Sequence, residues 1–168
     1  MNGQTAVRIL SIILLIISAN LIDAQKSYNI RKFSVYVPAG WKLMDHDVHL
    51  LEISSTKTMF MLYFYVIDND EIETRWRKLL TSLSKSLEFE DEQCDKGEYD
   101  LESGFHLTYG YCNVKLKDGG ARVKLITSQL VNDRDYAIIM YGFCTQNEFQ
   151  ACKNELRFIL DNVKYKEE

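Results

Sequence analysis

The chain has 168 residues, with 20 basic and 24 acidic side chains and a formal net charge of −4. This mild acidity argues against nucleic acid or an anionic membrane surface as a partner, since no basic stripe runs along the chain. The length and the 46% of hydrophobic residues suffice for one ordinary domain with its own core.

Residues 1–24 have the pattern of a signal peptide. Arg8 supplies a positive charge, residues 9–22 form an apolar run, and Ala24 offers a small residue for cleavage. A retained anchor is the alternative, although the run is shorter than the roughly 20 apolar residues of a membrane span. We therefore expect a single secreted or periplasmic domain over residues 25–168, without a stable membrane span once the leader is removed.

The first part of this domain is expected to form strands. Residues 32–37 alternate as a strand does, Pro38 and Gly40 follow in a turn, and a short strand runs over residues 48–54. Residues 59–67 (MFMLYFYVI) are continuously apolar or aromatic, and neither face of that segment carries a charge. The pattern predicts a central strand that is covered on both sides and around which the rest packs.

Two amphipathic helices are expected to frame the second part. The first spans roughly residues 71–87, with a capping box formed by Asp70 and Glu73, and the second follows a capping box of Thr145 and Glu148. Their apolar stripes are Ile72, Trp76, Leu79, Leu80, Leu83 and Leu87 in the first helix, and Phe149, Cys152, Leu156, Ile159, Leu160 and Val163 in the second.

The segment between the helices is expected to be mostly strand. Residues 88–102 are acid-rich and predict an exposed strand and turn, and longer strands follow at residues 104–117, 121–131 and 135–144. Asp118-Gly119 is a signal for a type I′ hairpin turn. Pairing about this turn places Cys112, Val114, Leu116, Val123 and Leu125 on one face, and Phe105, Leu107, Tyr109 and Tyr111 on the other.

The four cysteines, Cys94, Cys112, Cys144 and Cys152, are an even number in a chain with a leader, which favours two disulfides. Three pairings are possible. We prefer Cys94–Cys112 and Cys144–Cys152, because each pair joins neighbouring elements. A four-cysteine zinc site is the alternative, but the C-x-x-C spacing typical of such sites is missing.

The order strands, helix, four more strands and helix, together with the opening Phe-x-Val-x-Val-Pro-x-Gly-Trp at residues 33–41, resembles the PsbP-like and DcrB-like superfamily. The resemblance covers nearly all of residues 33–165. It implies an α+β fold in which two helices sandwich an antiparallel sheet of about six to seven strands. Members are mostly non-enzymatic accessory subunits, envelope proteins and partner-binding modules, so the resemblance implies neither catalytic residues nor a cofactor. The start at Ala24-Gln25 also resembles exported proteins of the Bacteroidetes type.

The densest cluster of metal-capable side chains lies at residues 45–49. His46 and His49 are three residues apart and could both reach one zinc or copper ion, with Asp45 or Asp47 completing the shell. The alternative is a polar loop that follows Trp41.

The second candidate is an aromatic surface. The chain has 10 tyrosines. Those on expected sheet strands are Tyr63, Tyr65, Tyr109, Tyr111 and Tyr141. Tyrosine combines a large contact area with a polar tip, so a sheet face left uncovered could bind a partner or an apolar ligand. The alternative is that the two helices cover these rings.

Catalytic signatures are missing. The chain has no Gly-x-Ser-x-Gly motif, and no pair of carboxylates stands in a recognisably apolar setting. We therefore expect a non-catalytic exported domain that binds an envelope protein or a small ligand. A metal-binding or metal-delivery protein that uses residues 45–49 is the second hypothesis, and a hydrolase is the third.

Overall fold

The computed structural model of the protein describes residues 25–90 and 94–166. Within these residues the strands form an 8-stranded sheet and a 3-stranded sheet, both antiparallel. The larger sheet has the order β3 (Trp41–His46), β4 (Leu50–Ser55), β5 (Met61–Asp68), β10 (Tyr136–Thr145), β9 (Arg122–Val131), β8 (His106–Leu116) and β6 (Leu87–Phe89), with β7 (Asp95–Asp100) also paired to β8. The smaller sheet has the order β1 (Gln25–Ile30), β2 (Phe33–Pro38) and β11 (Val163–Tyr165).

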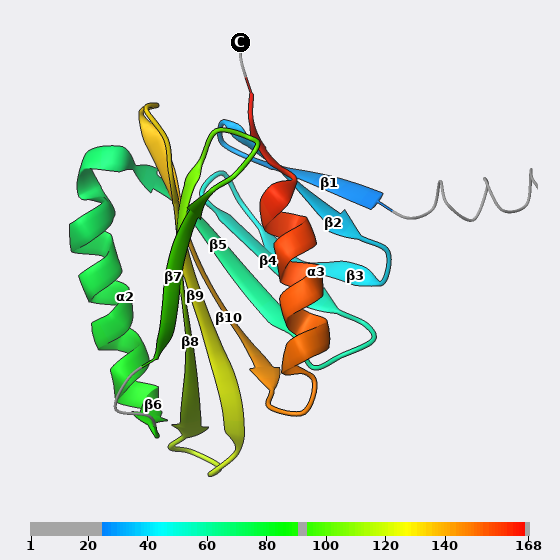
Figure 1. Cartoon of the computed structure of the whole chain (residues 1–168), viewed down its shortest axis with the longest axis vertical. Coiled ribbons are helices and arrows are strands. Elements are labelled where there is room, and N and C mark those ends of the chain that lie inside the picture. The colour runs from blue at the N-terminus through cyan, green and yellow to red at the C-terminus, as the bar shows by residue number, and fades with distance from the viewer. Residues whose placement is uncertain (1–24, 91–93, 167–168) are drawn as a thin grey trace, which may run out of the picture.

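The large sheet is the middle layer of the molecule. Helix α2 (Ile72–Ser86), which follows the short 3-10 helix η1 (Asn69–Glu71), stands on one side of it (Figure 1). Helix α3 (Phe149–Asp161) and the small sheet stand on the other side. The fold is therefore α+β with a helix on each face of an antiparallel sheet, as the sequence predicts in outline.

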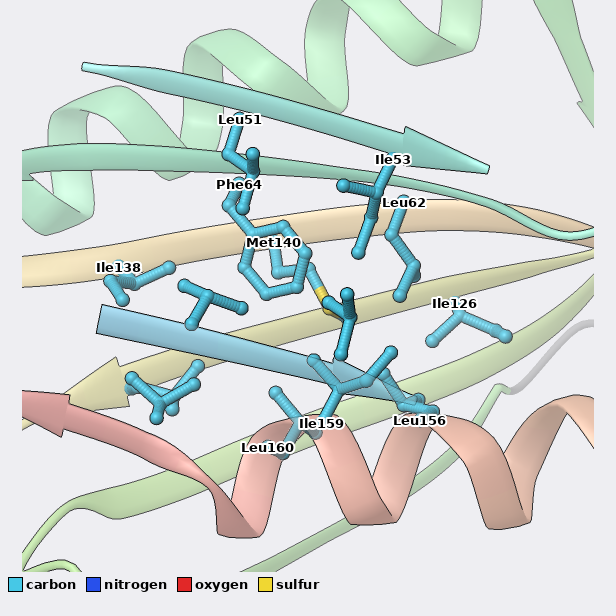
Figure 2. Close-up of a cluster of buried hydrophobic side chains, with 14 of the residues drawn as sticks. Leu51, Ile53, Leu62, Phe64, Ile126, Ile138, Met140, Leu156, Ile159 and Leu160 are labelled. Carbon is cyan, nitrogen blue, oxygen red and sulfur yellow. The ribbon is translucent and has the colours of Figure 1, made fainter. Parts of the chain in front are cut away.

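The main hydrophobic core lies between the large sheet and α3. Alternation along β5 directs Leu62, Phe64 and Val66 into it, and each of these side chains is at most 3% exposed. Figure 2 shows Leu62 and Phe64 in the same cluster as Leu156 and Ile159 of α3. The predicted stripe of the second helix is confirmed by the burial of Cys152, Leu156, Ile159 and Leu160.

The face of the sheet toward α2 is packed much less tightly. A small cluster of Leu87, Cys112, Val114 and Leu125 forms there, but α2 itself has no buried residue. The opposite side chains of β5, Tyr63 and Tyr65, are only half-buried, and Met59 just before the strand is 75% exposed. The prediction that residues 59–67 are covered on both sides is thus correct for one face and wrong for the other.

The large sheet has 8 strands, more than the about six to seven that the resemblance implies, and the small sheet adds three. Strand β1 pairs in full with β2, and β3 pairs with β4, although neither β1 nor β3 has the alternation of a typical strand. The predicted face assignment is confirmed on β8 and β9, where Cys112 pairs with Leu125 and Val114 with Val123.

Three predicted local motifs are wrong. Of the residues in the β8–β9 turn only Gly120 has a positive φ, at 67°, so Asp118-Gly119 does not form a type I′ turn. The N-cap of α2 is Glu71 and that of α3 is Glu148, and neither makes a side-chain capping bond. Helix η1 precedes α2 where the first capping box was expected. Thr145 Oγ1 donates to the Glu148 carboxylate, whereas in a capping box it would accept a backbone N–H of the helix.

The predicted leader, residues 1–24, lies outside the described part of the chain. Neither helix in residues 25–90 and 94–166 has the length and the apolar character needed to cross a membrane.

Gly142 on β10 offers a test of the packing between β10 and β5. A Cβ at this position would lie 2.6 Å from Leu62 Cδ2 and closer still to the Met61 carbonyl oxygen, so the two strands would have to separate. We expect Gly142→Ala to lower the free energy of unfolding by about 1–3 kcal/mol, as overpacking does. Urea unfolding measures the change. Gly119→Ala is the control, because a Cβ there meets nothing within 4 Å. Equal unfolding midpoints for the two variants would contradict the tight approach of β10 and β5.

Candidate functional site

A pocket of about 730 Å³ lies between helix α2 and the large sheet. Trp76 and Leu80 of α2 form one wall, and β8 and β9 form the floor. The edge strand β7 closes one side, and Phe89 of β6 lies at an end. Small-molecule sites in proteins typically measure about 300–1,000 Å³, so the pocket has room for one ligand.

The pocket exists because α2 is held at its ends and not along its length. Before its first turn, Asn69 Nδ2 donates to the carbonyls of Asn132 and Arg134, at 3.1 and 3.2 Å. After its last turn Leu87 is buried, and the Lys117 backbone N–H donates to the carbonyl of Ser86 at 3.0 Å. Between these attachments the helix bridges the sheet with its apolar stripe only half-buried.

The side chains at the centre of the pocket floor are small, which leaves space between the sheet and α2. Gly110 on β8 pairs with Thr127 on β9, and a Cβ on the glycine would lie 3.0 Å from Thr127 Oγ1. The neighbouring pair, Thr108 and Gln129, supplies short or flexible polar groups. The apolar parts of the lining are Trp76, Leu80, Phe89, Leu125 and the Cys94–Cys112 disulfide. An apolar enclosure with a few hydrogen-bonding groups is suited to binding.

The cysteines behave as two different pairs. Cys94 and Cys112 form a disulfide that joins the start of β7 to β8 and lines the pocket, in the preferred pairing. Cys144 and Cys152 are both free and buried, and their thiols share a hydrogen bond. The expected second disulfide is therefore wrong in this structure, although the two elements do meet. The interaction with Cys152 and burial raise the pKa of the Cys144 thiol, and the same interaction lowers the pKa of the Cys152 thiol.

A cluster of ionisable groups around His106, the first residue of β8, lies next to Glu98 of the pocket lining. The His106 ring lies with Nδ1 2.8 Å from Asp100 Oδ1 and with Nε2 3.8 Å from Glu98 Oε2. The hydrogen bond to Asp100 is the main cause that raises the pKa of His106 above 6.5, and the charges of the two carboxylates add to it. Glu98 lines the pocket together with Lys96, so both signs of charge are present at this rim.

The aspartates of the predicted metal cluster at residues 45–49 accept backbone N–H groups of the turn between β3 and β4. Asp47 Oδ1 accepts the backbone N–H groups of His49 and Leu50, at 2.6 and 2.7 Å, and these bonds lower its pKa. Asp45 Oδ1 accepts the N–H of His46, whose ring lies 2.6 Å from the carbonyl of Asn29. Among the residues that the structure describes, no group of three His, Cys, Asp or Glu side chains could hold a metal ion. His46 and His49 are therefore not gathered with the aspartates around a common point.

The five predicted tyrosines are divided between the two faces of the sheet. Tyr141 stacks on Tyr63 and Tyr65 at 4.7 and 6.1 Å between ring centroids, on the face toward α2. Tyr109 and Tyr111 belong to the opposite face, where Tyr111 is 8% exposed and burial raises its pKa to about 12. Tyr63, Tyr65 and Tyr141 form one stacked group, whereas Tyr109, although it packs against the main core, also lines the pocket beside Gly97.

Sequence reasoning missed the pocket, since it treated the α2 stripe as a packed one. The sequence signal for the pocket would have been two small residues on neighbouring strands that face the helix. Gly110 and Thr127 offer a full apolar stripe too little to pack against.

No protein-family model matches the chain, and no curated protein is similar to it in sequence. Among solved structures, the chain is similar to LpqN of Mycobacterium tuberculosis, which is described as involved in cell envelope biogenesis. That match has 11% identity and a TM-score of 0.56, and covers 85% of this chain and 92% of LpqN. The chain is also similar to PA94 of Pseudomonas aeruginosa, a protein of unknown function, with 9% identity, a TM-score of 0.47 and coverage of 86% and 99%. The likeness to LpqN shows a shared fold.

The disulfide in the pocket wall is expected to stabilise the domain. It joins cysteines 18 residues apart, and cross-links of this span stabilise proteins by about 3 kcal/mol through the unfolded state. We expect the double variant Cys94→Ser, Cys112→Ser to lose roughly that free energy of unfolding in urea. A reductant should bring the wild type to the level of the variant and leave the variant unchanged. If full reduction of the disulfide left the free energy of unfolding of the wild type unchanged, this stabilising role would be contradicted.

The His106 cluster gives a pH-dependent contribution with a defined sign. Because its pKa is raised in the folded chain, protonated His106 stabilises the fold below about pH 6.5, and this contribution is lost as the pH rises through the folded value. We expect an NMR titration midpoint above 6.5 for His106. Asp100→Asn should move it down further than Glu98→Gln does, since Asp100 makes the shorter contact. If the titration midpoint of His106 were unchanged in Asp100→Asn, Asp100 would not be the main cause of the raised pKa.

Proposed function

We propose that this chain is a non-catalytic, exported domain that binds a small ligand with an apolar chain in the pocket beneath α2. The observation that carries the proposal is the 730 Å³ pocket, walled by Trp76, Leu80 and Phe89 and floored by the sheet. An apolar chain in this space would cover a helix stripe that the fold leaves half-exposed.

The driving force for such a ligand is burial of apolar surface. Each methylene group removed from water contributes roughly 0.8 kcal/mol, so a medium-length alkyl chain supplies useful affinity without any ionic contact. Binding would remove half-buried Trp76 and Leu80 from water together with the ligand, and would add contacts along the middle of α2. No nucleophile, general base or metal centre is needed for this role.

Export and an envelope setting belong to the same proposal. The leader pattern of residues 1–24 and the Cys94–Cys112 disulfide are both typical of proteins that act outside the cytoplasm. The fold shared with LpqN, whose description refers to cell envelope biogenesis, is compatible with such a setting. Membership of the PsbP-like and DcrB-like superfamily is likewise proposed, on the order of elements and the residues 33–41 opening.

The proposal is tested with decanol, a neutral probe that has a single alkyl chain. Trp76 lines the pocket, whereas Trp41 is buried in the main core and donates to Glu155, so a change in tryptophan emission on binding reports on Trp76. We expect a saturable blue shift in the wild type. Leu80→Glu should weaken binding about tenfold or more, because it places a charge against the apolar chain.

Thr81→Glu is the matched control. It adds the same charge at the next position of α2, where the side chain is exposed and does not line the pocket, so the affinity for decanol should be unchanged. Calorimetry provides a measure that does not depend on Trp76. If decanol does not bind the wild type, or if both variants weaken it equally, the pocket is not the binding site.

A further inference from the structure

The strand rows that form the floor of the pocket continue across the same sheet face to half-buried residues outside the pocket. Thr127, which lines the pocket, pairs across β9 and β10 with Tyr141, and Tyr141 pairs in turn with Tyr63 on β5. Tyr63 pairs with Glu52 on β4. Residues paired in this way point to the same side of a sheet, so one row runs from the pocket to Glu52.

We define the tyrosine strip as Tyr63, Tyr65 and Tyr141 together with Glu52. Tyr65 lies in the next row, beside Leu50 on one side and Ile139 on the other. The three rings stack on one another with interplanar angles of 9° and 7°, and all three are half-buried. Unlike the tyrosines of the opposite face, the strip is not part of the main core.

The strip combines three neutral phenol hydroxyls with the carboxylate of Glu52. The Tyr63 hydroxyl lies near the Glu52 carboxylate, and the Tyr141 hydroxyl lies near that of Tyr65. Burial, together with these partners, raises the pKa of Tyr63 and Tyr141, so the phenols keep their protons at neutral and mildly alkaline pH. Each hydroxyl still offers lone pairs, and the carboxylate can accept further hydrogen bonds.

This chemistry selects among headgroups. Glu52 disfavours an anion by charge repulsion. A quaternary cation could approach Glu52 but would leave the phenol hydroxyls unused, and the stacking of Tyr141 on Tyr63 and Tyr65 takes up ring surface that it would otherwise contact. A group with several hydroxyls can donate to Glu52 and accept from the phenols in one contact.

We propose that the ligand of the pocket carries an uncharged, hydroxyl-rich headgroup such as a sugar, which binds the tyrosine strip while its apolar chain lies beneath α2. The inference rests on the proposed function and names the class of ligand, a single-chain glycolipid or similar amphiphile. The continuous row from Thr127 to Glu52 supplies the path between the two parts of such a molecule.

The test compares ligands that share one decyl chain and differ in the headgroup. Decyl maltoside, decanoate, decyltrimethylammonium and decanol are titrated into the full chain below their micelle concentrations, by calorimetry. We expect decyl maltoside to bind about tenfold more tightly than decanol, as two or so additional hydrogen bonds would provide. Decanoate and decyltrimethylammonium should show no such gain.

Variants test whether the tighter binding of decyl maltoside depends on the tyrosine strip. Tyr63→Phe combined with Tyr141→Phe removes the two hydroxyls and keeps the rings, so the stack is retained while the maltoside advantage over decanol should fall to within a factor of about two. Tyr36→Phe, on β2 in the small sheet, is the matched control and should keep the full advantage.

The outcomes separate this inference from the pocket itself. If decanol binds but maltoside is no tighter, or if the advantage survives in the double variant, the headgroup inference is wrong and the pocket stands. If decyltrimethylammonium is the tightest ligand, the strip recognises cations and the inference is again wrong. If none of the four binds, the proposed function fails as well.

Discussion

The attachment of α2 at its two ends is the constraint on which the candidate site depends. Asn69 ties the start of the helix to carbonyls more than 60 residues away, and the burial of Leu87 with the bond from Lys117 ties its end. These contacts fix where the helix begins and ends, but they do not draw its middle onto the sheet. A helix that packed along its whole length would leave no pocket, and a helix tied at one end would leave no defined wall.

The two faces of the large sheet differ in how completely their side chains are buried. The face toward α3 holds most of the almost fully buried side chains, and it supplies most of the hydrophobic stabilisation that a domain of this size needs. Because that face suffices, the other can leave Trp76 and Leu80 half-exposed and keep Gly110 and Thr127 small. The apolar surface that this face leaves exposed can be buried by a ligand, and that burial would contribute to the free energy of binding.

Much of the fold could be predicted from the sequence where a local pattern decides the outcome. Alternation over residues 59–67 gave β5 and its buried face, and helical spacing gave both helices to within a few residues of their ends. Strands β1 and β3 could not be predicted, because their residues form strands through pairing with β2 and β4 and not through their own pattern. Residue type alone was misleading at residues 45–49, where Asp47 is engaged by the backbone of the turn.

The pocket could not be predicted for a related reason. The stripe of α2 has the composition of one that packs fully, and a helical pattern records which side is apolar but not how far that side lies from the sheet. That distance is set by contacts between residues remote in sequence. The same holds for the tyrosine strip, since only the register of β9, β10 and β5 shows that Tyr141 and Tyr63 continue the row that begins at Thr127. An open sheet face beside a bridged helix is therefore a property of the assembled fold, and the chemistry of its ligand follows from which side chains that register brings into one row.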